Sequence, residues 1–478
     1  MNFATPAFFL FLPLVLLIYH SLRGRHHQYR FLLVASWFFY MSWNPWFIWV
    51  IVVTSIIDYI AALRMDTATT LGRKKFWLWL SIVSNLGLLA FFKYTNFFLG
   101  NGLALAHYIG WPGVSASTKP LWDIILPLGI SFHTFQGISY TLDVYRGKIP
   151  AVRNFVDFAL FVAFFPQLVA GPIVRAVEFL PQMETPPRVT MQHVVEGLHW
   201  FLLGMFKKAF LADRLAQFVD PVFAEPALYD AVTHRWAILA YAAQIYCDFS
   251  GYSDLAIGCA KWFGFQLPQN FNFPYLSASI AEFWKRWHIS LSTWMRDYLY
   301  FGLGGSRCGA LRTSLNLLLT LTLCGLWHGA SWNYILWGFY NGVLLVLHRV
   351  YDQTLTRFAW AERLRGGRAY RLLAVVCTLV MVCFGLVLVR SESWSGCWLV
   401  QSSLLGGGPA LATRWVPAWV PLLVGLVAAG HLFSGLRNVR CGLWRLPALA
   451  RASAYAVATL LIVAFGPGTT KAFIYFQF

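Results

Sequence analysis

The chain has 478 residues, of which 58% are hydrophobic, 18% aromatic and only 12% charged. Soluble domains carry about 25% charged residues, so this composition excludes an ordinary soluble enzyme, and its hydrophobicity excludes a disordered chain. The net charge of +18 does not indicate nucleic-acid binding, because the basic residues form short clusters between apolar stretches, as in the cytoplasmic loops of membrane proteins.

Long apolar stretches recur along the chain and predict an all-α, polytopic membrane protein. A run of about 18 or more apolar residues is long enough to cross a bilayer as a helix. Such runs lie at 3–19, 31–57, 76–92, 313–348 and 372–389. Together with weaker apolar segments, they predict about eleven transmembrane helices in a single domain, residues 1–478, with interfacial helices between them.

The loops between the first runs alternate in charge. Residues 20–30 and 63–75 are rich in arginine and lysine, whereas 100–120 contains only Lys119. Because basic loops face the cytoplasm, both ends of the chain are predicted outside. No basic residue precedes the first run, unlike in a cleavable signal peptide, so that run is predicted to be a retained span.

Two apolar runs depart from a simple span. Asn44-Pro45 interrupts the run 31–57 and predicts two helical pieces that meet at a kink. The run 313–348 has basic clusters at both ends, so it should enter and leave on one side. Each half, of roughly 16 residues, would be about 24 Å long, which is short of the ~30 Å hydrocarbon core. Its turn, near Trp327-His328-Gly329, is therefore predicted inside the membrane or in a cavity that thins it.

Residues 279–298 predict an amphipathic helix that is too polar to span a membrane. Spacings of three and four residues place five apolar side chains in one stripe: Trp284, Trp287, Leu291, Trp294 and Tyr298. A polar stripe beside it contains Lys285, His288, Ser292 and Arg296. We expect this helix to lie along the interface or to fill the protein interior. A surface helix without a chemical role is the alternative.

Ionisable residues at membrane depth are costly and indicate function. His328, His288 and His133 are the main candidates in this sequence. His328 stands between Gly325 and Gly329, where backbone and ligand can approach closely. A neutral imidazole there could accept a proton from a hydroxyl group as a general base. The alternative for each histidine is a hydrogen-bonded packing residue.

Asp248 and Asp254 flank a polar patch in an otherwise apolar region. They could couple an ion in a transporter or hold a structural hydrogen-bond network. A transporter would need a path of intramembrane carboxylates, but Asp58, Asp143 and Asp157 are predicted near span ends. No spacing of cysteine, histidine and carboxylate resembles a zinc site, and no GxSxG turn is present. Neither a metal nor a serine nucleophile is therefore predicted.

Several motifs together resemble one family. They are LPLGISF at 126–132, AGPIVR at 170–175, IYCDFSGYSD at 245–254, QNF at 269–271, FWKRWHISLSTW at 283–294, LWHG at 326–329 and the terminal FIYFQF at 473–478. In this order, and over essentially the whole chain, they resemble the membrane-bound O-acyltransferases, and within them the bacterial alginate O-acetyltransferase branch.

The resemblance implies a ring of tilted helices around a central tunnel, where a cytoplasmic acyl donor meets an acceptor from the other side of the bacterial inner membrane. The family's essential histidine falls on His328 and its second signature histidine on His288, within a catalytic core at 279–348. His133 departs from the branch, which usually has an aromatic residue there. The expected donor is acetyl-CoA, or otherwise an acyl-carrier thioester, with no permanently bound cofactor.

The resemblance also implies an acceptor hydroxyl on an exopolysaccharide such as alginate, or on a periplasmic acetyltransferase partner. His288 could orient the donor or stabilise an oxyanion, and Asp248 could hold local structure. Lys285, Arg286 and Arg296 could attract the phosphates of CoA or reach lipid head groups. The remaining residues expected to bind substrate or support the site are Ser250, Tyr252, Trp287, Ser292 and Trp327. Alternatives are acylation of cellulose, peptidoglycan or teichoic acid (by D-alanine), a transporter or flippase, and a structural subunit of a secretion complex.

Overall fold

The computed structural model describes residues 1, 3, 5–111, 114–115, 118, 124–168, 171–185, 188–407, 412–437 and 447–465. Within these residues the protein is helical, and no strand is present beyond an isolated bridge between Tyr229 and Thr413. The predicted all-α class is therefore confirmed. The chain divides into two compact units, Met1–Gly197 with Cys259–Leu267 and Leu198–Gly258 with Pro268–Phe478. The single domain over 1–478 stays a prediction.

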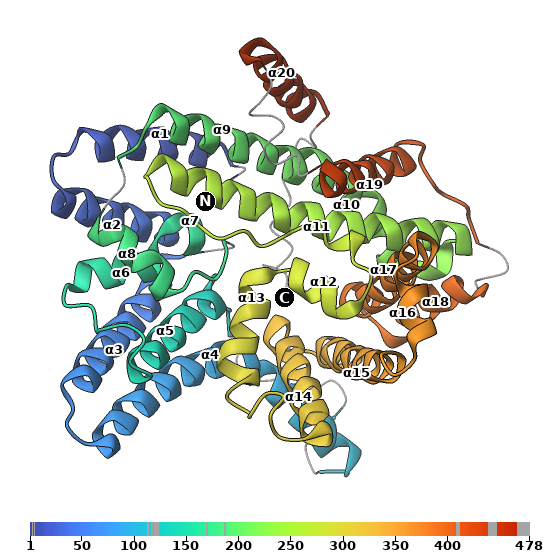
Figure 1. Cartoon of the computed structure of the whole chain (residues 1–478), viewed down its shortest axis with the longest axis horizontal. Helices are drawn as coiled ribbons and strands as arrows, with labels where there is room; N and C mark the ends of the chain where they lie inside the picture. The colour runs from blue at the N-terminus through green and yellow to red at the C-terminus, as the bar shows by residue number, and fades with distance from the viewer. Residues whose placement is uncertain are drawn as a thin grey trace. The chain divides into compact units, whose positions relative to one another are not determined.

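The first unit is built from the N-terminal helices (Figure 1). These are α1 (Pro6–Ser21), α2 (Arg25–Met41), η1 (Pro45–Phe47), α3 (Ile48–Thr67), α4 (Leu71–Tyr108), α5 (Ile130–Tyr145), α6 (Phe155–Ala163), α7 (Phe165–Leu168) and α8 (Ala176–Glu184). α3, α4 and α5 pack against one another as a bundle. The predicted break at Asn44-Pro45 is confirmed, because α2 ends at Met41 and the Asn44 side chain caps η1 by accepting a hydrogen bond from the Trp46 amide.

Asp58 lies in the middle of α3, not near the end of a span as predicted. The apolar run ends at residue 57, but α3 continues past it to Thr67, so Asp58 lies well inside the helix. The buried carboxylate accepts hydrogen bonds from the Ser81 hydroxyl (2.6 Å) and the Asn85 amide (2.8 Å) of α4. A Cβ at Gly137 of α5 would lie 2.1 Å from the same carboxylate. Such polar contacts hold membrane helices together, so the geometry favours a structural role for Asp58.

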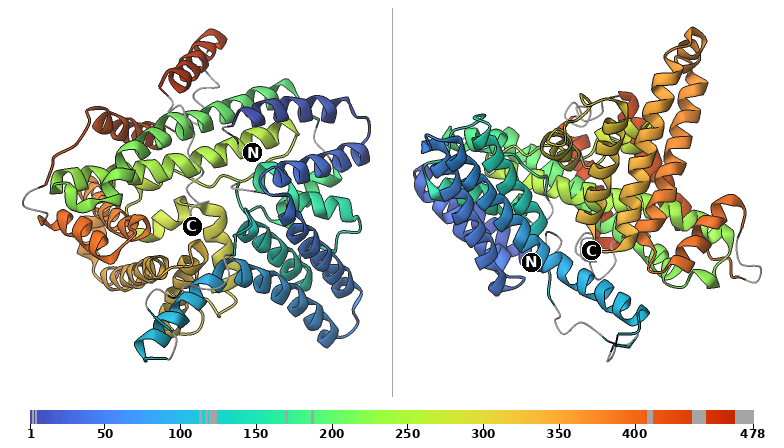
Figure 2. Two further views of the ribbon diagram at one scale, coloured as in Figure 1. Left: turned by 180° about the vertical axis from the view of Figure 1, so that it is seen from behind. Right: turned by 90° about the horizontal axis from the view of Figure 1, so that it is seen from below.

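The second unit contains the remaining helices, and α9 (Met191–Met205) and α11 (Ala231–Trp262) contribute residues to both units. Its elements are η2 (Phe206–Ala212), α10 (Asp213–Ala224), η3 (Pro226–Leu228), η4 (Pro274–Leu276), α12 (Ile280–Arg286), α13 (Ile289–Trp294), η5 (Met295–Tyr300), α14 (Ala310–His328), α15 (Trp332–Leu355), α16 (Ala359–Arg365), α17 (Arg368–Arg390), α18 (Trp394–Ser402), η6 (Ser403–Leu405), α19 (Trp419–Arg437) and α20 (Ala448–Phe465). η2 and η5 are π-helical. α15 packs between α14 and α17 (Figure 2).

Among the described residues, four helices are long and apolar enough to cross a membrane: Pro45–Thr67, Leu71–Tyr108, Ala310–His328 and Arg368–Arg390. Shorter apolar helices are Pro6–Ser21, Trp419–Phe433 and Ala448–Ala464. These helices fit the predicted membrane protein, whereas the count of about eleven spans stays a prediction. Lys119, Ala170 of the AGPIVR motif and the terminal FIYFQF motif lie outside the described residues.

The hairpin predicted over 313–348 forms, but its helices are longer than predicted. α14 has 19 residues and α15 has 24, because both continue into the polar residues that were counted as flanks. α14 is therefore long enough to cross a membrane, and the prediction that both halves of the hairpin are too short is wrong. The turn is confirmed, since α14 ends at His328 and α15 starts at Trp332.

The predicted single helix over 279–298 is wrong. α12 ends before Trp287, and His288 has a backbone φ of 42°, a left-handed conformation that a right-handed helix does not include. α13 and η5 then complete the segment. The apolar stripe is buried, as expected if the segment fills the protein interior, but His288 is buried as well, while Lys285 and Arg296 are exposed. Because the helix is interrupted at His288, the His288 side chain does not lie on the polar face that the helical spacing predicted.

Candidate active site

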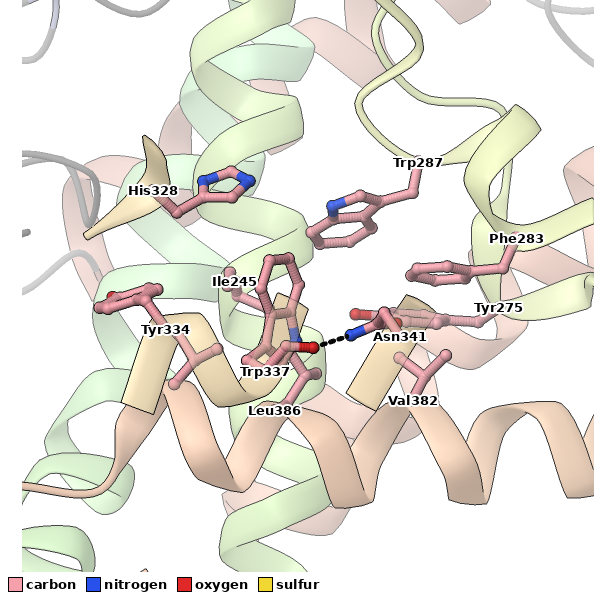
Figure 3. A pocket seen from close by; sticks show the side chains of 11 residues that line it. Ile245, Tyr275, Phe283, Trp287, His328, Tyr334, Trp337, Asn341, Val382 and Leu386 are labelled. Carbon is pink, nitrogen blue, oxygen red and sulfur yellow. Dashed lines mark hydrogen bonds between the residues drawn. The ribbon is translucent and has the colours of Figure 1, made fainter. Parts of the chain in front are cut away.

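His328, the last residue of α14, lines a small cavity in the second unit. The cavity has a volume of about 30 Å³. Its other walls are mostly aromatic and aliphatic side chains from α11, α12, α15 and α17, with Tyr275 of η4 and Trp287 completing it (Figure 3). Trp337 packs edge-on against the His328 imidazole, with 5.2 Å between ring centroids. The site is thus a narrow apolar cavity with an imidazole in its wall.

Two glycines bring α14 and α15 together beside His328. A Cβ at Gly325 would lie 2.2 Å from the carbonyl oxygen of Tyr334, and a Cβ at Gly329 would lie 2.2 Å from the Tyr334 ring. Neither distance is possible for a real side chain, so both positions require glycine for packing. The predicted close approach of backbone is confirmed at Gly325, where the Tyr334 carbonyl of α15 lies; the approach of a ligand stays a prediction.

His288 lies beside His328, with 6.4 Å between their ring centroids. Its side chain has no exposed surface, and its ring packs edge-on against Phe249 of α11 at 4.5 Å. Burial disfavours the charged form of imidazole, so the surroundings favour a neutral His288. The fold therefore places the two predicted histidines together, although they come from different helices.

A second, larger cavity of about 310 Å³ lies in the same unit. Polar groups line part of it, among them Ser250, Lys207 and Asp254. Lys207 pairs with Asp254 at 2.6 Å, so the lysine charge is already neutralised inside the cavity. His431 of α19 also lines it and donates from Nδ1 to the Val427 carbonyl at 2.9 Å. At this size, the cavity is in the range of small-molecule sites.

Asp248 belongs to a buried ion cluster. Lys208 of η2 is only 1% exposed and pairs with Asp213 at 2.8 Å and with Asp248 at 2.5 Å. Its ammonium also lies 6.0 Å from the centre of the Tyr252 ring. A buried lysine needs such partners, because removing its charge from water is costly. This geometry fits the structural role that we predicted for Asp248 and places Tyr252 in the same cluster.

The predicted basic residues lie away from both cavities. Lys285 is exposed, and Arg286 pairs with Glu282 at 2.6 Å. Arg296 pairs with Asp297 at 2.6 Å, and this hydrogen bond raises the pKa of the Arg296 guanidinium above its ordinary value.

Of the remaining predicted residues, Trp287 lines the small cavity and Trp327 packs beside His328 with 4.8 Å between ring centroids. The hydroxyl of Ser292 donates to the Trp287 carbonyl at 3.1 Å. His133 lies in α5 of the first unit, where it is 1% exposed; its role stays open.

Sequence reasoning missed three residues of the larger cavity and its surroundings. Lys207 and Lys208 interrupt the apolar stretch 201–212, and His431 interrupts the apolar helix α19. Each is an ionisable residue inside an apolar segment, so the rule that selected His328 could have selected these positions too.

Comparisons with known proteins identify the family of this chain. Residues 149–389 match the membrane-bound O-acyltransferase (MBOAT) family, and this range contains both His288 and His328. The probable alginate O-acetylase AlgI of Azotobacter vinelandii is 41% identical over 414 residues, which cover 85% of this chain and 79% of that protein.

Two further relatives extend the comparison. The probable alginate O-acetylase AlgI of Pseudomonas aeruginosa is 41% identical over 413 residues, 85% of this chain and 75% of that protein. The peptidoglycan O-acetyltransferase of Helicobacter pylori is 38% identical over 387 residues, 74% of this chain and 72% of that protein. With its similarity to alginate O-acetylases over most of its length, the chain is an acyltransferase and belongs to the membrane-bound O-acyltransferase family.

Proposed function

We propose that this protein transfers an acetyl group from a cytoplasmic thioester, acetyl-CoA, to a hydroxyl group, with His328 as the general base. The observation that carries the proposal is the position of His328 in the wall of a small apolar cavity. At about 30 Å³ the cavity is small, which favours a short acyl group such as acetyl over a long chain.

In the proposed reaction the acceptor oxygen attacks the carbonyl carbon of the thioester. His328 removes the hydroxyl proton as the new C–O bond forms, the C–S bond breaks, and the proton then leaves with the thiol. The aromatic walls at Trp337 and Trp287 are apolar, which disfavours water beside the reacting atoms and so limits loss of the acetyl group by hydrolysis. His288, 6.4 Å away, orients the donor or stabilises the developing oxyanion.

The larger cavity is proposed to hold the pantetheine arm of the donor. That arm is uncharged and carries amide and hydroxyl groups. The Lys207–Asp254 pair leaves the cavity without an uncompensated cation to attract phosphate, while Ser250, Ser253 and Asn270 offer hydrogen-bonding groups. Tyr275 lines the small cavity and stacks on His431 of the larger one, with 5.2 Å between ring centroids, so this ring pair lies between the two cavities.

The acceptor is proposed to be a hydroxyl of an exopolysaccharide, or of a periplasmic acetyltransferase that passes the group on. Relatives named for alginate and for peptidoglycan both support a polysaccharide. In this proposal the protein lies in the bacterial inner membrane with both ends outside, and about eleven helices surround a tunnel. An acyl-carrier thioester is the alternative donor, since teichoic acid D-alanyltransferase of Bacillus subtilis is also similar, at 28% identity over 292 residues.

The test uses the full chain in lipid nanodiscs with acetyl-labelled CoA, a polysaccharide acceptor and the periplasmic partners. Wild type should transfer label, and His328→Ala should reduce turnover ~100- to 10,000-fold, as expected for loss of a general base. His348→Ala is the matched control, because His348 lies on α15 outside both cavities. Full turnover by a folded His328→Ala variant would contradict the proposal, as would an inactive wild type with every component present.

A further inference from the structure

We propose that Asn270 is a positioning residue for the acyl transfer, because it holds the strained turn that carries His288. The inference rests on the proposed function, in which His288 acts beside His328. Asn270 is 1% exposed and lies in the QNF motif, in the segment between α11 and η4. Its own side chain is not required to touch the reacting atoms.

The turn at His288 has an unfavourable backbone conformation. Its φ of 42° lies in the left-handed region, a strained conformation for a residue with a Cβ, which persists only where the surrounding structure enforces it. Among the described residues, only Phe273 is a second case with a side chain, and it lies three positions after Asn270. A catalytic-site imidazole on such a turn needs neighbours that keep the backbone in place.

Asn270 supplies three hydrogen bonds to the two residues that follow His288. Its main-chain oxygen accepts from the Ile289 amide at 2.9 Å. Its side-chain Oδ1 accepts from the Ser290 amide at 3.3 Å and from the Ser290 hydroxyl at 2.6 Å. These bonds satisfy amides at the start of α13, where helix geometry leaves them without partners. The beginning of α13 is therefore fixed to the Asn270 segment.

The same side chain connects the turn to α11. Its Nδ2 donates to the Ser253 hydroxyl at 3.2 Å, and one turn earlier in α11 the ring of Phe249 packs against the His288 imidazole. Asn270 thus joins the backbone after His288 to the helix that contacts the His288 ring. A carboxamide is suited to this, because it donates and accepts at once.

A second pair of hydrogen bonds holds the residues before His288, and it uses no side chain of the QNF motif. The Asn272 amide donates to the Arg286 carbonyl at 2.9 Å, and the Arg286 guanidinium donates to the Asn272 carbonyl at 3.3 Å. Both use main-chain atoms of Asn272, whose side chain is exposed. Replacement of Asn272 by alanine keeps both bonds and provides a matched control.

The test compares turnover, donor KM and thermal stability of the full chain in nanodiscs for three variants. Asn270→Ala should lower kcat by ~10- to 100-fold, the range expected when a reacting group is misplaced by about 1 Å. Asn270→Asp keeps the acceptor for Ser290 and should recover part of that loss. Asn272→Ala should keep wild-type kcat. Ser290→Ala, which does not touch the larger cavity, should lower kcat without raising donor KM.

A double-mutant cycle separates positioning from general destabilisation. If Asn270 acts through His288, then Asn270→Ala should cost nothing further in a His288→Ala background. Full additivity of the two losses would overturn the inference, and so would wild-type kcat for Asn270→Ala. If His288→Ala has no measurable turnover, the cycle cannot be completed, and the comparison of Asn270→Asp with Asn270→Ala replaces it. In that case, an Asn270→Asp variant that recovers no turnover would overturn the inference. If wild type transfers no acetyl group, the proposed function is contradicted, but the contacts of Asn270 at the turn are not. The thermal stability of Asn270→Ala and Asn272→Ala would then still show whether Asn270 stabilises the turn.

Discussion

His288 and His328 approach with 6.4 Å between their ring centroids although each is buried in its own segment. His328 lines the small cavity, and His288 lies next to it without lining that cavity itself. Two histidines in such an arrangement can act on different atoms of one substrate. The arrangement fits a base at the attacking hydroxyl and a donor at the carbonyl oxygen.

The first prediction concerns the length of the transferred acyl chain. Leu386 of α17 lines the small cavity (Figure 3), and Leu386→Ala removes carbon atoms from its wall. Because the cavity then has room for further methylene groups, the variant should raise kcat/KM for butyryl-CoA relative to acetyl-CoA by about tenfold, a typical gain for one or two accommodated methylenes. Competition between the two labelled donors measures this ratio.

Leu388→Ala is the control for Leu386→Ala. Leu388 lies on the same helix and is equally buried, at 6% against 5% exposed, but does not line the cavity. Both variants should lose stability, by ~2–5 kcal/mol for a leucine buried in a core. An unchanged donor preference in Leu386→Ala, or the same change in both variants, would show that the acyl group does not occupy this cavity.

The sequence predicted the elements with a strong local signal. The break at Asn44-Pro45 follows from a proline that cannot continue a helix, and the turn after His328 follows from glycine and flanking polar residues. His288 and His328 are selected as ionisable residues in apolar stretches, and the resemblance indicates the same two positions. The helical class follows from the long apolar runs, because a segment that crosses a membrane must satisfy its backbone hydrogen bonds internally, as an α-helix does.

The sequence did not predict features that depend on contacts between distant segments. The left-handed backbone of His288 breaks a pattern with perfect helical spacing, and it persists because Asn270 bonds to the residues after it. The glycines beside His328 indicate a close approach, but only the fold shows that Tyr334 of α15 makes it. The pairing of Lys208 with two carboxylates likewise joins η2, α10 and α11.

The second prediction tests the larger cavity by filling it. Gly430 of α19 lines this cavity, and a Cβ there would meet no atom within 4 Å. Gly430→Leu can therefore place a side chain in the cavity without strain and should raise the KM for acetyl-CoA, by about tenfold for a displaced hydrogen-bonding group.

Gly425→Leu provides the comparison for Gly430→Leu. Gly425 lies on the same helix, also has no atom within 4 Å of a Cβ, and does not line the cavity. Its KM should match that of wild type. Equal KM values in both variants would exclude the larger cavity as the donor site.

The third prediction concerns the charge balance around Lys208. One buried lysine faces Asp213 and Asp248. Asp248→Asn leaves a lysine and one carboxylate, which still neutralise each other. Lys208→Met leaves two carboxylates that share a buried site, and removing the cation from such a cluster costs about 3–5 kcal/mol. Lys208→Met should therefore unfold at a clearly lower temperature than Asp248→Asn, measured by thermal denaturation in detergent. If Asp248→Asn unfolded at the lower temperature of the two variants, Asp248 would have a role beyond charge balance. Acetyl transfer by Asp248→Asn, measured at a temperature where the variant is folded, would then test that role.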